Sequence, residues 1–198
     1  MVNENFTAQQ WIDYFLDKIE KDDSFTVNDL REAVKTISVH DPVAGEGALT
    51  VLYSGEGDAF PKALADKAGS GIRMIDRTEA SKFLTHKDFY KIFKNAVEFE
   101  YEGAAEDSEL FSELERKFLY DGSSGSVAEG SWRASEGFWS IVSRRFASET
   151  SGDSYALVSN ALPNRIFGTD ELKTLLETLP DGAKICGFNT ARGVVVAA

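Results

Sequence analysis

The chain has 198 residues, of which 42% are hydrophobic and 27% are charged, and its formal net charge at pH 7 is −12. This composition is typical of a globular protein with one or two small cores, and no apolar run reaches membrane-spanning length. So acidic a chain disfavours binding to nucleic-acid backbones, which requires clustered cations, although a net charge does not exclude a local basic patch. One cysteine, Cys186, excludes an internal disulfide framework, and two histidines make a structural zinc site a poor expectation. We therefore expect a soluble protein with neither nucleic acid nor membrane as partner.

Two amphipathic helices are predicted in the first 40 residues. Thr7 is placed to cap the first, in which apolar residues recur every four positions from Trp11, and Asn28 is placed to cap the second.

A parallel α/β unit is predicted next. An apolar run at 48–53 indicates a buried strand, a helical pattern follows at 59–68, and a second short strand is indicated at 72–75. Strand, helix, strand is the order of parallel sheets.

Helical periodicity resumes at 78–93 and 110–119. The stretch 98–121 holds nine acidic and two basic side chains. This pattern favours a solvated helical face, and the alternative is a docking surface for a basic partner.

The Gly- and Ser-rich tract 121–126 is the only linker-like segment. It either is a surface loop or divides the chain into a helix-rich part, 1–125, with one or two strands, and an α/β part, 126–198, within one compact functional unit. In the second part the pattern predicts helices at 138–146 and 169–176 and strands at 155–159, 184–188 and 193–196. The predicted fold class is mixed α/β (α+β): an N-terminal helical subdomain and a small, mainly parallel sheet flanked by helices.

Three features could carry chemistry, and each has an ordinary structural explanation. The run Ser54-Gly-Glu-Gly57 follows a strand and precedes a helix, where backbone amides can hold phosphate or simply form a turn. Trp139 could pack in a core or stack on a heteroaromatic ring. Glu171 follows Thr169 and Asp170, which fit the cap and the first turn of a helix without any functional role.

A resemblance goes beyond these alternatives. Residues 138–147, Phe-Trp-Ser-Ile-Val-Ser-Arg-Arg-Phe-Ala, resemble the signature helix of the ADP-ribosyl cyclase / NAD glycohydrolase family. Residues 154–160 resemble the strand that follows it in that family. Ile166-Phe-Gly-Thr-Asp-Glu-Leu172 resembles the segment that carries the family's catalytic glutamate. The resemblance is good over 137–187, is looser back to residue 49, and implies an ADP-ribosyl cyclase-like fold.

The resemblance implies an enzyme that cleaves the nicotinamide–ribose bond of NAD, with NAD as the substrate and no metal or further cofactor. A carboxylate near the ribose stabilises the oxocarbenium-like transition state of such a cleavage, and Glu171 stands at that catalytic position. Trp139 and Tyr53 stand at aromatic walls for the bases, and Ser54 and Ser143 at phosphate contacts. The substrate-binding positions implied by the family are Trp139, Tyr53, Ser54, Ser143, Asp76, Thr78, Phe167 and Arg144.

Three departures from the family pattern stand out. The chain cannot form the disulfides of the ectoenzymes, Asp76 is one methylene shorter than the family's glutamate, and Gly55 replaces a phosphate-facing arginine. Arg73, Arg133 or Arg144 could substitute for that arginine. These departures resemble disulfide-free, toxin-like bacterial members. The implied setting is the cytoplasm, or the cytosol of a target cell for a secreted effector, and the implied partner is an immunity or inhibitor protein.

Other functions stay open at this stage. The same site could close NAD to cyclic ADP-ribose instead of admitting water, or could transfer ADP-ribose to a protein. A different class of function is a nucleotide-binding or inhibitor module without activity, for which Glu171 would be dispensable.

Overall fold

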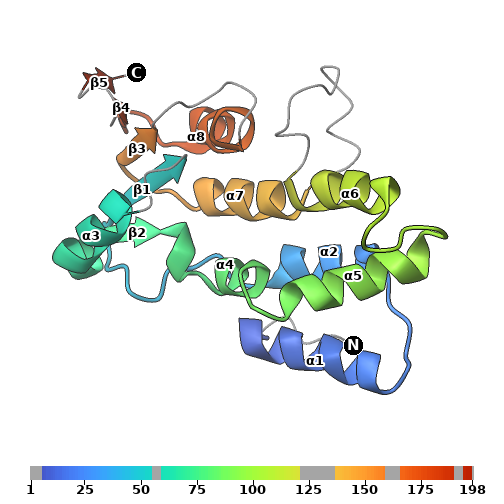
Figure 1. Cartoon of the computed structure of the whole chain (residues 1–198). Helices are drawn as coiled ribbons and strands as arrows, with labels where there is room; N and C mark the ends of the chain where they lie inside the picture. Colours follow the sequence, from blue (N-terminus) through green and yellow to red (C-terminus); the bar gives the residue numbers. More distant parts are fainter. Residues whose placement is uncertain (1–5, 55–58, 121–136, 159–165, 190–193, 198) are drawn as a thin grey trace. The chain divides into compact units, whose positions relative to one another are not determined.

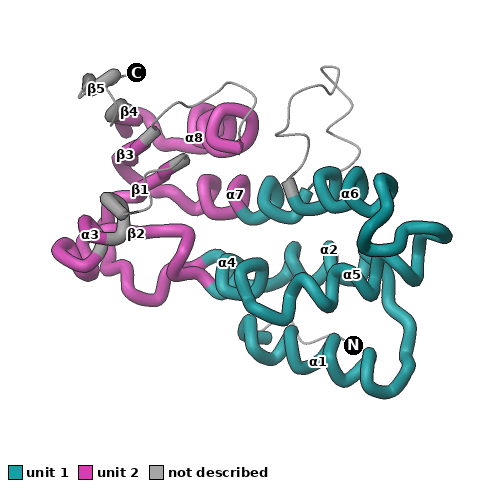
Figure 2. Tube along the Cα trace, in the orientation of Figure 1, with its two compact units in different colours: residues 1–39, 79–142 teal, residues 40–78, 143–198 magenta. Residues whose placement is uncertain are grey.

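The computed structural model describes residues 6–54, 59–120, 137–158, 166–189 and 194–197 (Figure 1). The chain forms two compact units: residues 1–39 with 79–142, and residues 40–78 with 143–198 (Figure 2). These units interleave along the sequence and do not follow the predicted division at residue 126. The linker-like tract itself lies outside the described residues.

The first unit is built from helices around an aromatic core. Its large, fully buried side chains include Phe15, Phe83, Phe93, Phe111 and Phe138. The rings of Phe93 and Phe138 meet edge-on with centroids 6.2 Å apart, a favourable arrangement of aromatic quadrupoles. The helices are α1 (Ala8–Glu20), α2 (Val27–Thr36), α4 (Glu79–Leu84), α5 (Phe89–Glu100), α6 (Glu109–Glu115) with a π-helical turn (Arg116–Tyr120), and the first part of α7 (Phe138–Ser148).

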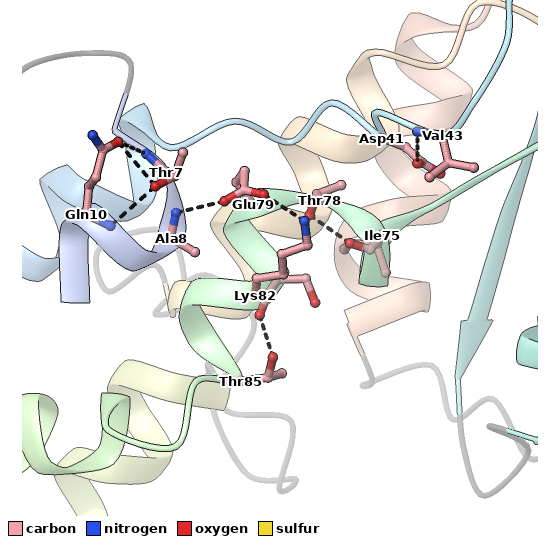
Figure 3. Close-up of polar contacts among 11 residues, drawn as sticks. Thr7, Ala8, Gln10, Asp41, Val43, Ile75, Thr78, Glu79, Lys82 and Thr85 are labelled. Atoms are coloured by element: carbon pink, nitrogen blue, oxygen red, sulfur yellow. Dashed lines mark hydrogen bonds and ion pairs between the residues drawn. The ribbon is translucent and has the colours of Figure 1, made fainter. Parts of the chain in front are cut away.

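The helix starts explain two sequence predictions. Thr7 caps α1 as predicted, and forms a reciprocal capping box with Gln10 (Figure 3). The prediction of Asn28 as the cap of α2 was wrong: Thr26 caps it, because Asp29 three residues later accepts the Thr26 amide at 2.7 Å. Asn28 lies inside the first turn.

The helix predicted at 78–93 is two helices. Directly after α4 the Thr85 hydroxyl donates to the Ser81 carbonyl at 2.8 Å. The Thr85 amide still donates to the same Ser81 carbonyl at 2.9 Å. The next amide, of His86, donates only three residues back, to the Phe83 carbonyl at 3.3 Å, so the regular helix ends there. α4 is fixed at its start by Glu79, which accepts the amide of Ala8 at 2.8 Å and pairs with Lys82 at 2.7 Å (Figure 3).

The second unit contains a five-stranded sheet in the order β2-β1-β3-β4-β5. The first four strands are parallel, and β5 is antiparallel to β4. Their bounds are β1 (Leu49–Ser54), β2 (Ile72–Met74), β3 (Ser154–Val158), β4 (Ile185–Asn189) and β5 (Val194–Ala197), and the unit's other helices are α3 (Ala59–Ala68) and α8 (Leu172–Thr178). The structure confirms a mixed α/β protein with a small, mainly parallel sheet flanked by helices (Figure 1).

A small core fixes the edge of this sheet. Val51, Ile72, Met74 and Leu157 are buried together, and side chains of α3 pack against them. Asp41 is fully buried beside this edge. Its carboxylate accepts the amides of Met74 and Val43 at 2.8 and 2.9 Å.

Arg73 joins β2 to the end of α7. Its guanidinium donates to the Phe146 carbonyl at 2.8 Å, pairs with Glu149 at 3.1 Å and lies 3.8 Å from the Phe146 ring centroid. Arg73 is thus committed to α7, which leaves it a poor substitute for a phosphate-binding arginine. Arg133, another candidate for that role, lies outside the described residues.

None of the described helices combines the length and the apolar character needed to cross a membrane.

Candidate active site

The sheet topology points to one place for a ligand. From β1 the chain crosses to β2 on one side, and it later returns to form β3 on the other side of β1. In open parallel sheets, ligands bind at the carboxyl ends of the strands where the winding direction reverses. Here that point lies between β1 and β3.

A π-helical turn, Phe167–Glu171, is the next described element after β3, and it contacts β1. We refer to it below as the Glu171 turn. The Leu172 amide donates to the Phe167 carbonyl five residues back, the hydrogen bond that defines a π turn. Such turns are rare and occur frequently at functional sites.

Glu171 is a buried carboxyl group, with 6% of its surface exposed. It accepts a hydrogen bond from the Ser143 side chain on α7. The pKa of Glu171 is raised from 4.5 to about 7, chiefly by burial and to a smaller extent by the neighbouring Asp170 charge, while the Ser143 hydrogen bond opposes both. Glu171 therefore titrates near neutral pH, where a proton or a cationic ligand decides its charge.

Asp170 is buried beside it, with 3% of its surface exposed. One carboxylate oxygen accepts from the Thr169 hydroxyl at 2.8 Å. The other forms an ion pair with Nε of Arg144 at 3.5 Å. Adjacent residues of α7, Ser143 and Arg144, thus contact adjacent residues of the Glu171 turn.

The structure brings together four of the residues predicted from the family resemblance. Ser143, Arg144, Phe167 and Glu171 lie on α7 or on the Glu171 turn within the second unit. Phe167 opens the turn and is buried. The prediction that Thr169 caps a helix was wrong: Thr169 lies within the π turn, and its hydroxyl donates to Asp170 instead.

The other predicted residues have separate surroundings. Tyr53 is half-buried and packs against the core of β1 and β2. Thr78 is buried, and its hydroxyl donates to the Ile75 carbonyl at 2.7 Å (Figure 3). Asp76 follows β2, and burial raises the pKa of its carboxyl group. Ser54 is the last residue of β1, and its side chain is not among the parts that the structure describes. Gly55 lies outside the described residues.

Trp139 belongs to the part of α7 assigned to the first unit. It is half-buried and lies one helical turn before Ser143 along α7.

Sequence reasoning missed Asp170 as a buried group. The recurrence of Phe167, Glu171 and Leu175 every four residues, all three of them buried, marks Glu171 and gives no signal for its neighbour Asp170. A carboxylate on an apolar face is either paired or held for chemistry.

Among the described residues, no group of three or more histidine, cysteine or carboxylate side chains is placed to hold a metal ion. No protein-family model matches the chain, and no curated protein matches it at a significant level.

Proposed function

We propose that the protein hydrolyses the nicotinamide–ribose bond of NAD, with Glu171 as the catalytic carboxylate. The observation that carries the proposal is the buried Glu171 on a π turn that contacts β1, with Glu171 hydrogen-bonded to Ser143. The sequence resemblance of 137–187 to NAD-cleaving enzymes supplies the substrate.

The electrostatics of Glu171 suit this reaction. Nicotinamide in NAD is a cationic ring, and an opposite charge within a few ångströms favours the ionised form of a carboxyl group. Binding of NAD should therefore lower the pKa of Glu171 from about 7 and ionise it. The carboxylate then faces positive charge that develops on the ribose as the C–N bond breaks, in surroundings where water screens it little.

The chemical balance is that of a simple hydrolysis. The glycosidic C–N bond breaks and its electrons leave with neutral nicotinamide. Water adds to the ribosyl carbon, ADP-ribose forms and one proton is released. No oxidant or metal enters this balance.

The first experiment is incubation of the purified full-length chain with NAD, followed by chromatographic separation of the products. We expect nicotinamide and ADP-ribose from the parent chain. Glu171→Gln should lose at least about a hundredfold in rate, because a neutral amide cannot offset the ribosyl charge. Glu177→Gln is the matched control, since Glu177 is an exposed glutamate on the following helix α8.

Each alternative gives a different result in this assay. Cyclic ADP-ribose as the main product would identify a cyclase, and labelled protein after incubation with labelled NAD would identify a transferase. Intact NAD with a folded chain, shown by circular dichroism, would refute the enzymatic proposal and favour a binding module.

A further inference from the structure

A second buried carboxylate adjoins the proposed catalytic one, and the function proposed above assigns it no role. Asp170 is almost fully buried, and it belongs to the same π turn as Glu171. Burying a second charge beside the first is unfavourable unless it is compensated. Thr169 and Arg144 supply that compensation, at 2.8 and 3.5 Å.

The two polar contacts between α7 and the Glu171 turn run in parallel. Ser143 binds Glu171, and the next residue, Arg144, pairs with Asp170. The Arg144 side chain is 30% exposed and the Asp170 side chain 3%, so the ion pair reaches from the surface to the interior. Arg73 holds the following turn of α7 through the Phe146 carbonyl. The helix that supplies Ser143 and Arg144 is therefore fixed at its end.

We propose that Asp170 is a positioning residue: through its ion pair with Arg144 it fixes the Glu171 turn against α7 and sets the protonation state of Glu171. This role rests on the proposed function only in so far as Glu171 is catalytic. Asp170 acts through Glu171.

Few charged residues surround Glu171 among the described elements, so the effect of each on its ionisation can be tested separately. Asp170 adds a negative charge on the turn itself, and Arg144 on α7 forms an ion pair with that charge at 3.5 Å. Strand β1, which contacts the turn, carries no charged residue. The charged residues of α8, Lys173 and Glu177, are exposed. Asp170 and Arg144 are thus the charges whose removal should move the ionisation of Glu171 most.

Removal of the Asp170 charge and removal of the Arg144 charge should shift the pKa of Glu171 in opposite directions. Asp170→Asn takes away a like charge and leaves Arg144 to favour the ionised form, so the pKa of Glu171 should fall. Arg144→Gln leaves Asp170 without this counter-charge, so the pKa of Glu171 should rise. Shifts of about one pH unit are the size expected for neighbouring charges in a partly dry site. A general loosening of the fold would instead expose Glu171 in both variants and lower its pKa in both.

The pKa of Glu171 can be measured without activity. The free energy of unfolding in urea is compared between each chain and the same chain carrying Glu171→Gln, from pH 4.5 to pH 9. This free-energy difference changes with pH over the range in which Glu171 titrates. The pH at the alkaline end of that range, where the difference stops changing, marks the pKa of Glu171 in the folded state. We expect this pH to fall in Asp170→Asn, to rise in Arg144→Gln, and to stay unchanged in the control Asp181→Asn, which alters an exposed aspartate.

At saturating NAD, the pH midpoint of the acidic side of the kcat profile should fall in Asp170→Asn and rise in Arg144→Gln. Shifts in one common direction, or no shift in either variant, would overturn the proposal. Opposite shifts in the unfolding experiment without any NAD turnover would retain the role of Asp170 and refute the proposed function.

Discussion

At the scale of single residues, Glu171 is a group that opposes the stability of the fold. Its pKa in the folded protein is about 7, against 4.5 for an ordinary glutamate. A carboxyl group with a raised pKa in the folded state favours folding less as the pH rises through that interval. The penalty is absent below about pH 4.5 and complete above about pH 7. A residue kept at such a cost is more readily explained by chemistry than by packing.

Glu171→Gln should therefore stabilise the protein at alkaline pH. Glutamine stays neutral and can still accept the Ser143 hydroxyl, so the variant escapes the ionisation penalty. The shift from 4.5 to about 7 corresponds to roughly 3 kcal/mol. We expect a gain of that order in unfolding free energy at pH 8 and little gain at pH 4.5, measured by urea denaturation. An equal effect at both pH values would show that Glu171 does not titrate between them.

The sequence could identify Glu171 but not its surroundings. The family resemblance and the four-residue spacing from Phe167 to Leu175 both mark the position. The pairing of Asp170 with Arg144 depends on how α7 and the Glu171 turn meet, which is a contact between residues 26 positions apart in the chain. Local patterns carry no information about such contacts.

At the scale of elements, the apolar patterns predicted most helices and strands, whereas their ends depended on side-chain competition. Thr26 and Asn28 are both acceptable caps by residue type, and Asp29 decides between them by completing a capping box with Thr26. Thr169 was an equally acceptable cap, but the backbone there forms a π turn that encloses Asp170. Periodicity predicts an element better than its first residue.

The contact between Arg73 and α7 is the element-scale interaction that we expect to matter most for stability. Arg73→Met retains an apolar stem but leaves the Phe146 carbonyl without its guanidinium donor and removes the cation from the Phe146 ring. We expect a loss of about 2 kcal/mol in unfolding free energy. Glu149→Gln removes only the half-exposed partner of the ion pair, so its effect should stay below about 1 kcal/mol. Equal losses in the two variants would mean that the surface ion pair dominates.

At the scale of the whole molecule, the chain passes between its two units after residues 39, 78 and 142. Neither unit is a continuous stretch of sequence. Composition suggested a boundary at the Gly- and Ser-rich tract, because such tracts often join domains. The sheet contradicts a division there: β1 precedes the tract, β3 follows it, and the two strands pair from Thr50 opposite Ser154 to Ser54 opposite Val158.

We therefore predict that the fragments 1–125 and 126–198 do not fold separately. The first would keep β1 and β2 but lose β3, and its helical part would lose Phe138, whose ring contacts Phe89 and Phe93. The second would expose the edge of β3 that β1 covers, and unpaired strand edges favour aggregation. Each fragment alone should show poor amide dispersion by NMR and no cooperative thermal transition.

The control is the full chain with a protease site inserted at 121–126 and cut only after folding. Its two pieces should stay associated and unfold cooperatively, because the pairing of β1 with β3 and the contacts of Phe138 already exist when the backbone is cleaved. Stable, cooperative folding of 126–198 alone would contradict the prediction. That result would mean that β3 and β4 with the Glu171 turn form a sufficient core without β1, and that the burial of Glu171 is independent of the first 125 residues.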